Sequence, residues 1–383
     1  MSDHLTFYQT NEVSPVLQDV ADAKKHLVRR ESLYRSLGLP STFFRDRTVL
    51  EVGPGSGQNS LHVASSMPSS LTLVEPNKSG VIQIEKSFGE WKFEHTKPLV
   101  VQETAQVFFE SNLKQFDIVI AECWLGNTPQ GKSIIRGLKN SLNTGGVVVL
   151  TSSPHIGLLA NALRSLLGYR ITSDPALGFQ ERVNRLLGAF RSHLDNLQGM
   201  SRFYEDWIID VLLNPGALIE FISPVDLILI LQDLDLLGTY PKISESWTWY
   251  KDFKSTDLNF DNQWIENYWR RSHNFLDTRT PIDSTCDSIA NQQLDNFCKI
   301  LIERVVTIRD HDQPDSQSLS ILESVKELIP KQNKLVTDAF SEFLQVYSSQ
   351  NISISDVSEM KMFGGWFGRE LMYMSFIRQD LVI

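Results

Sequence analysis

The feature that most constrains the fold is a short apolar strand that runs directly into three glycines. Residues 48–52 are Thr-Val-Leu-Glu-Val, glycines follow at positions 53, 55 and 57, and a helix-compatible segment begins at about Gln58. Glycine has no Cβ, so a ligand can approach the backbone of such a turn closely, next to the N–H groups that open the helix. The sequence therefore predicts a strand–turn–helix unit with a ligand-accessible backbone.

Further short apolar runs alternate with helix-compatible segments along the first 150 residues. We expect strands at 48–52, 71–74, 99–102, 117–121 and 147–151, with an amphipathic helix over 14–37 ahead of them. Such alternation is typical of a parallel sheet that carries helices on both faces. The predicted fold class is α/β, with a Rossmann-like, mostly parallel sheet.

After residue 151 the pattern becomes mostly helical. Candidate helices lie at 156–167, 177–197, 224–237, 262–275, 288–308 and 320–347. The last stretch differs again, because residues 359–363 and 370–378 have the pattern of two strands joined across Gly364 and Gly365. We therefore expect a terminal antiparallel hairpin that returns to the sheet, preceded by a large, mainly α-helical insertion.

These patterns divide the chain into four parts. We expect an N-terminal helical segment at 1–40, a Rossmann-like core at 41–154, a helical insertion at 155–356 and the terminal hairpin at 357–383. The length of 383 residues exceeds the usual range of a single domain, about 100–200 residues, which favours more than one structural unit.

A second acidic position completes the ligand-binding pattern. The apolar run 71–74 ends at Glu75, 22 residues after Gly53. A carboxylate at that place can accept hydrogen bonds from both ribose hydroxyls of an adenosine. Together, Glu51, the glycine loop and Glu75 resemble the cofactor signature of class I S-adenosylmethionine (SAM) dependent methyltransferases, an E-x-G-x-G-x-G loop with an acid at the end of the next strand.

This resemblance implies roles for the individual residues. Glu51 would reach the amino group of SAM, directly or through water, and Glu75 would hold the ribose. Pro76 and Asn77 follow this acid and would flank the adenine. The residues expected to line the methionine part of SAM are Gly53, Pro54, Gly55 and Gly57.

The resemblance extends to about residue 152, with one departure. The family commonly has an acid followed by alanine after the third strand, at the adenine edge, whereas this chain has Glu103-Thr104-Ala105. Either Glu103 or Thr104 can therefore take the contact, beside Ala105. Residues 116–122 resemble the family's fourth strand, and residues 138–150 resemble its next helix, turn and fifth strand.

Two positions favour SAM over a dinucleotide. Gln58 stands where a G-x-G-x-x-G motif has its third glycine, and Glu51 is an acid where dinucleotide folds usually have an apolar residue. An NAD-dependent oxidoreductase is therefore the less favoured enzyme class. A non-catalytic SAM-binding scaffold is a further alternative.

The loop after the fourth strand faces the transferred methyl group in the family. Here it is Glu122-Cys123-Trp124-Leu125-Gly126-Asn127, which lacks the [D/N]-P-P-[Y/F] motif of nucleic-acid amino methyltransferases. Methyl transfer to a hydroxyl needs a base. We expect Glu122 and His155 to be catalytic, and Glu122 also to contact the cofactor. His193 and His273 are weaker candidates, because a helical histidine is more often a surface or capped residue.

Composition and charge limit the classes of ligand and the cellular location to be expected for this protein. The net charge of −10 disfavours a general grip on nucleic acid, and the basic cluster at 24–30 indicates the solvent-exposed face of a helix. Three widely spaced cysteines fit neither a disulfide framework nor a zinc site, so we expect no metal. Without a run of about 20 apolar residues or a signal peptide, a cytoplasmic location is expected.

The acceptor is expected to be a small molecule or a glycan, because an insertion of this size can act as a lid over a bulky acceptor. A protein or peptide acceptor is the alternative. The oligomeric state does not follow from the sequence.

Overall fold

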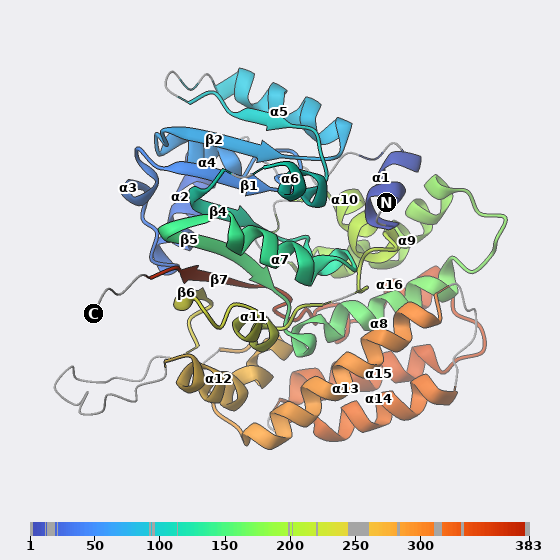
Figure 1. Ribbon diagram of the computed structural model, residues 1–383. Coiled ribbons are helices and arrows are strands. Elements are labelled where there is room, and N and C mark those ends of the chain that lie inside the picture. The colour runs from blue at the N-terminus through green and yellow to red at the C-terminus, as the bar shows by residue number, and fades with distance from the viewer. Residues whose placement is uncertain are drawn as a thin grey trace.

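The computed structural model describes residues 3–379 except 12, 14–19, 21, 92, 94–95, 113, 198–199, 201, 220, 244–259, 282–283, 310–315 and 331–332 (Figure 1). Within this part, seven strands form one sheet in the order β3-β2-β1-β4-β5-β7-β6. The first five run parallel, as expected. They are β1 (Thr48–Val52), β2 (Ser70–Val74), β3 (Leu99–Val101), β4 (Phe116–Ala121) and β5 (Leu142–Ser152).

The strands are apolar on both faces because helices cover both. Alternate strand residues point to opposite sides, so Val49 and Ile118 join one hydrophobic cluster while Leu50 and Val119 join another. The first cluster includes residues of α2 (Ala23–Ser36), α3 (Ser41–Phe44), α4 (Ser60–Ser65) and α5 (Lys78–Trp91). The second includes residues of α6 (Ala105–Ser111) and α7 (Gly131–Asn140).

Where the structure describes it, the N-terminal segment contains two helices rather than one. α2 begins at Ala23, where the side chain of Asp22 caps it by accepting a hydrogen bond from the Lys25 N–H at 2.9 Å. The predicted helix over 14–37 is therefore confirmed from residue 23 onward, and residues 14–19 and 21 lie outside the described residues. A separate helix, α1 (Asp3–Thr10), was not predicted.

The region after β5 is helical, as expected, and it shares its core with the sheet. All 17 residues of α8 (His155–Ile171) are buried, and the large hydrophobic cluster runs from the sheet through α8 into the outer helices. The outer helices are α9 (Phe179–Leu194), α12 (Phe260–Arg271), α13 (Ser288–Thr307), α14 (Ser316–Leu328), α15 (Lys334–Tyr347) and α16 (Ile354–Ser358). In Figure 1, α12, α13, α14 and α15 lie at the end of the molecule away from α5, whereas α9 lies near α1 and α10 (Tyr204–Ile208). None of the described helices is both long and apolar enough to cross a membrane.

Two helix predictions were wrong in part. The segment predicted as a helix over 224–237 ends early as α11 (Pro224–Ile230), and Asp235–Tyr240 is a strand, β6. There Gly238 packs against the backbone of Leu37, where an added Cβ would make a tight contact, 3.0 Å from the Leu37 Cα. The predicted helix over 320–347 is two helices, α14 and α15, because Pro330 follows the first and Asn333 caps the second.

The predicted return of the chain to the sheet is confirmed, but the predicted hairpin partner was wrong. β7 (Met372–Ile377) pairs antiparallel with β5 on one side and with β6 on the other. Residues 359–363 are not a strand. Phe363 and Trp366 are fully buried in the helical core instead, where the Trp366 indole N–H donates to the Leu276 carbonyl at 2.6 Å.

Candidate active site

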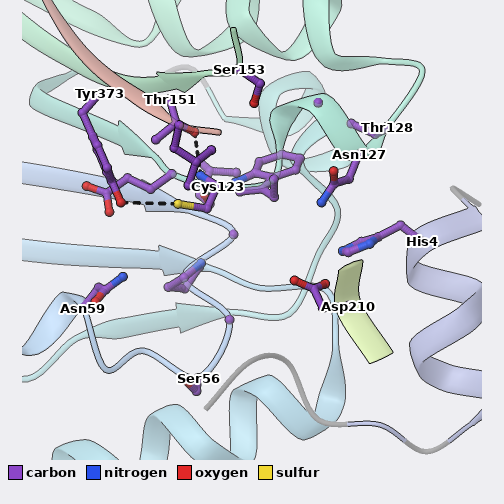
Figure 2. Close-up of a pocket in the computed structure, with 18 of the residues that line it drawn as sticks. His4, Ser56, Asn59, Cys123, Asn127, Thr128, Thr151, Ser153, Asp210 and Tyr373 are labelled. Carbon is purple, nitrogen blue, oxygen red and sulfur yellow. Dashed lines mark hydrogen bonds between the residues drawn. The ribbon is translucent and has the colours of Figure 1, made fainter. Parts of the chain in front are cut away.

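A cavity of about 1100 Å³ lies at the carboxyl ends of β1, β2, β4 and β5. One wall comes from the loops that follow these strands. Another comes from α1, α8, the helix α10 (Tyr204–Ile208) with the π-helical turn after it, and the loop residues Ala217, Leu218, Phe221 and Ile222. Figure 2 shows Tyr373 and Asn59 on one side of this space and His4 and Asp210 on the other. A parallel α/β sheet binds ligands at this edge.

Contacts inside the protein, as well as access for a ligand, explain why the loop has glycines. Gly53 has φ +72°, and a Cβ there would lie 2.7 Å from Cε2 of Trp124, whose indole N–H donates to the Val52 carbonyl at 2.8 Å. Of the predicted residues, Gly53, Pro54 and Gly55 line the cavity, whereas Gly57 does not. A Cβ on Gly57 would lie 2.7 Å from Cγ1 of Ile84, so that glycine serves the contact with α5.

Glu75 ends β2 and faces the glycine loop. Its carboxylate accepts hydrogen bonds from the backbone N–H groups of Gly55 and Asn77, both at 2.9 Å. Burial raises the pKa of Glu75 to about 7, although these two bonds oppose the rise. Pro76 and Asn77 line the cavity beside it, so the structure brings this predicted group together.

Glu51 is a buried carboxylate with an unused oxygen. Its side chain is almost inaccessible, and Oε2 has no hydrogen-bond partner within the described residues. Burial, and then the charge of Glu122, raise the pKa of Glu51 to about 7. A buried carboxylate in this state favours a ligand that brings a positive charge or an N–H donor.

Some of the residues predicted to border the adenine lie at the cavity. Thr104, Ala105 and Gln106 line the cavity, and Thr104 also caps α6 by accepting a hydrogen bond from the Val107 N–H. Glu103 does not line the cavity. Of the two alternatives left open by the sequence, the structure thus places Thr104 at the cavity.

Glu122 follows β4 and lines the cavity, but its carboxylate is already engaged. Arg30 of α2 donates to both of its oxygens at 2.8 and 2.7 Å, and the Tyr34 hydroxyl donates to one at 2.9 Å. The Arg30 and Glu122 side chains are only 8% and 5% exposed. The prediction that Arg30 lies on a solvent-exposed helix face was therefore wrong, since it pairs with an acid from a distant strand.

Cys123 lies next to Glu122 in a strained conformation, with φ +67°. Its N–H donates to Thr151 Oγ1 at 2.7 Å, and its Sγ lies 3.5 Å from the Tyr373 hydroxyl, as Figure 2 shows. The thiol faces the cavity, yet enclosure by the protein raises its pKa to about 11. It is therefore a neutral thiol near pH 7 and a poor nucleophile.

The predicted histidine bases lie away from the cavity. His155 is buried at the start of α8, and its Nδ1 lies 2.8 Å from Asp295 Oδ2 of α13, so helix packing turns the ring away from the cavity lining. His193 is bonded to the Val357 carbonyl, and burial lowers its pKa to about 3. His273 does not line the cavity either, and burial lowers its pKa.

A polar cluster on the helical side was missed by the sequence analysis. Asp210 accepts hydrogen bonds from Arg202 at 2.8 Å and from the Tyr8 hydroxyl at 2.5 Å. Asn214 Nδ2 lies 2.7 Å from Nδ1 of His4. The members come from α1 and from residues 202–214, and no local motif connects segments so far apart in the chain.

Comparison with known families identifies the sheet half of this site. The family model described as "Methyltransferase domain" matches residues 50–150, which begin within β1 and end within β5. Residues 50–150 are a SAM-dependent methyltransferase domain. The match begins at the glycine-loop strand and includes Glu51, Glu75 and Glu122.

No curated protein matches the chain. Several solved structures resemble part of it. A putative methyltransferase from Escherichia coli is 22% identical, with 32% of this chain and 68% of that one covered and a TM-score of 0.28. The [4+2]-cyclase SpnF is 20% identical over 33% of this chain and 44% of that one, with a TM-score of 0.29. The SAM-bound magnesium protoporphyrin IX methyltransferase of Synechocystis is 15% identical over 34% of this chain and 59% of that one, with a TM-score of 0.29. The chain thus spans between about two fifths and two thirds of these proteins.

The residues of the methyltransferase domain fit SAM. The unused oxygen of Glu51 suits the amino group of the cofactor, and Glu75, held in place by two backbone N–H groups, suits ribose hydroxyls. A side chain at Gly53 would collide with Trp124, so no side chain covers the loop backbone at this position. The buried acids and the loop together form a cradle for a ligand with both an amine and a ribose.

Proposed function

We propose that this protein transfers a methyl group from SAM to a small-molecule or glycan acceptor, and that the helical region after β5 forms the acceptor side of the site. The observation that carries the proposal is a single cavity that reaches both the glycine loop and the helical segments. A ligand held by Glu51 and Glu75 would leave the rest of this space for a second molecule. A site of this kind holds two reactants in line, which is most of what methyl transfer requires.

In the proposed reaction SAM supplies a methyl group activated by its sulfonium. The chain's own residues position the cofactor and exclude water. We propose that Glu51 and Glu75 hold the two ends of the cofactor, that Thr104 and Ala105 border its adenine, and that Glu122, braced by Arg30 and Tyr34, forms the cavity wall between cofactor and acceptor. His155 has no part in this mechanism, because its ring is committed to Asp295.

A cytoplasmic location is also proposed. Its support is chemical: Cys123, Cys286 and Cys298 are all free thiols, as expected for a reducing compartment.

The proposed function is tested by isothermal titration with S-adenosylhomocysteine (SAH), the product form of the cofactor. The wild-type protein should bind SAH with micromolar affinity. Glu75→Ala and Gly55→Val should each abolish measurable binding, since one removes the ribose acceptor and the other places a branched side chain in the loop. A useful control is Glu359→Ala, a change at an exposed acid outside the cavity, which should leave SAH affinity unaltered.

Failure of the wild-type protein to bind SAH would overturn the proposal. If SAH binds but no methylated product forms from a broad set of small molecules, glycans and peptides, the scaffold alternative gains support instead. Mass spectrometry of each reaction mixture would detect the added methyl group.

A further inference from the structure

The helical side of the cavity is predominantly apolar. Its lining includes Leu197, Met200, Trp207, Val211, Leu218 and Phe221. These side chains come from the segment between α9 and α11, and α1 adds Leu5. A surface of this kind gains free energy by removing apolar ligand surface from water, at about 25 cal/mol per Å². It offers few sites for the many hydroxyl groups of a sugar.

The charged and polar side chains in this wall largely satisfy one another. Arg202 pairs with Asp210, which also accepts from Tyr8, and His4 contacts Asn214. Groups already bonded inside the protein have little left to offer a polar ligand, because breaking such buried contacts is costly. This cluster therefore closes one end of the cavity without making that end a polar binding surface.

Glu370 is different. It lines the cavity just ahead of β7, and among the described residues its carboxylate has neither an ion pair nor a side-chain hydrogen bond, only its own backbone N–H. A Cβ on Gly157 would lie 3.3 Å from the Glu370 Cα, so α8 packs tightly against this backbone and holds it in place. Burial raises the pKa of Glu370, and the positive charges of Arg202 and Arg164 partly offset this rise. A carboxylate with a raised pKa is a better proton acceptor.

We propose that the helical side of the cavity binds an apolar acceptor that carries a hydroxyl group, and that Glu370 accepts the proton of that hydroxyl. This inference rests on the proposed function and narrows its acceptor class from small molecule or glycan to an apolar alcohol or phenol. In the reaction the acceptor O–H bond breaks and its proton moves to the Glu370 carboxylate. The oxygen bonds to the methyl carbon as the carbon–sulfur bond breaks, and the electron pair of that bond stays on sulfur.

The test uses apolar probes on the intact protein saturated with SAH, so that the cofactor side of the cavity is filled. The fluorescent probe N-phenyl-1-naphthylamine should bind with micromolar affinity and gain fluorescence. 4-Phenylphenol should displace it at least tenfold better than its methyl ether, 4-methoxybiphenyl, because only the phenol can donate a hydrogen bond to the charged carboxylate. UDP-glucose should not displace the probe.

Matched variants separate the two parts of the inference. Leu197→Glu should weaken probe binding at least tenfold, whereas Leu229→Glu, at an exposed leucine outside the cavity, should not. Glu370→Leu should abolish the preference for the phenol over its ether and leave probe binding intact. Glu359→Leu, at an exposed acid, should preserve that preference.

Two results would overturn the inference: no probe binding to the SAH-loaded protein, or displacement of the probe by UDP-glucose. Equal binding of the phenol and its ether would remove Glu370 from the proposed role. SAH affinity is measured in the same samples. Loss of SAH binding in the wild type overturns the proposed function itself, whereas SAH binding without probe binding overturns only this inference.

Discussion

The two sides of the cavity are built in different ways. Most of the cofactor side comes from the ends of consecutive strands between Glu51 and Trp124, one contiguous stretch of chain to which α2 adds Arg30. The helical side combines α1 with parts of α8, the lining residues between Leu197 and Ile222, and Glu370 with Leu371, which are far apart in sequence. The first side is therefore specified by local turns and the second by tertiary packing.

The two sides also differ in how they hold charge. The Arg30–Glu122 pair on the cofactor side is 8% and 5% exposed, and the Arg202–Asp210 pair on the helical side is 24% and 20% exposed. On the cofactor side Glu51 additionally has an unpaired oxygen. We infer that the charged groups of the cofactor side depend on ligand and counter-charge, whereas those of the helical side, apart from Glu370, are paired with one another.

The largest expected effect tests this difference directly. Arg30→Met should lower the free energy of unfolding by about 3–5 kcal/mol, because it leaves the buried Glu122 charge without its partner. Arg202→Met should cost roughly half as much, since that pair is more exposed and Tyr8 still donates to Asp210. Urea unfolding followed by tryptophan fluorescence measures both. Equal losses in the free energy of unfolding would show that the deeper burial of the Arg30–Glu122 pair does not make it more important for stability.

A smaller effect is expected from one added methyl group. Gly53→Ala should cost about 2–4 kcal/mol, the sum of left-handed backbone strain and the collision with Trp124. Gly145→Ala has similar φ, +73°, but meets no atom within 4 Å, so it isolates the backbone strain. Gly216→Ala would crowd His4 on the helical side and should leave SAH affinity unchanged. Thermal unfolding and SAH titration of the three variants check this order, and a Gly145→Ala loss as large as that of Gly53→Ala would contradict it.

The smallest expected effect is a pH dependence of SAH affinity, which comes from acids on the cofactor side. Glu51 and Glu75 both have pKa values raised to about 7, and each holds SAH best when ionised. SAH affinity should therefore rise about tenfold or more between about pH 6 and pH 8, as these acids lose their protons. Calorimetry at several pH values measures the slope, which Glu51→Gln should reduce.

The pH dependence of folding stability has the opposite sign to that of SAH affinity. In the unliganded protein the folded state keeps protons that the unfolded state releases, so these acids make stability fall as pH rises from the usual glutamate value of 4.5 to about 7. Asp210 behaves differently, because Arg202 lowers its pKa against the effect of burial. Asp210→Asn should leave the pH dependence of SAH binding unchanged, and a flattened slope in that variant would contradict the division between the two sides.

The sequence predicted the parts of the molecule that depend on neighbouring residues. The five parallel strands, the glycine loop, and Glu75 with Pro76 and Asn77 follow from local apolar runs and turn residues, and the structure has them where they were expected. β6 was taken for the end of a helix because its pairing with β7 joins distant segments. His155 was predicted as a base from its place after β5, but packing against α13 decides where its ring points.

The polar contacts between segments that are far apart in the chain had no sequence signal of their own. Arg30 was predicted to lie on a solvent-exposed helix face. Its partner, Glu122, follows a strand about ninety residues later, so no local pattern revealed the pair. Tyr8 and Asp210 meet only through tertiary structure, and Glu370 gains its position from the close packing of Gly157. Periodicity cannot reveal such contacts, because it describes which face of an element is apolar and not which element that face meets.

The pairing of β6 with β7 has a consequence for anyone who wishes to shorten this protein. β6 lies between helices of the region after β5, yet it is the outermost strand of the sheet, next to β7. Deleting residues 155–356 as a block would turn β7 into an uncovered edge with unpaired N–H and C=O groups, which invites self-association. A minimal catalytic fragment would have to keep Asp235–Tyr240 and rejoin the chain around it. The helical region therefore contributes a strand to the sheet and cannot be removed as a separate domain.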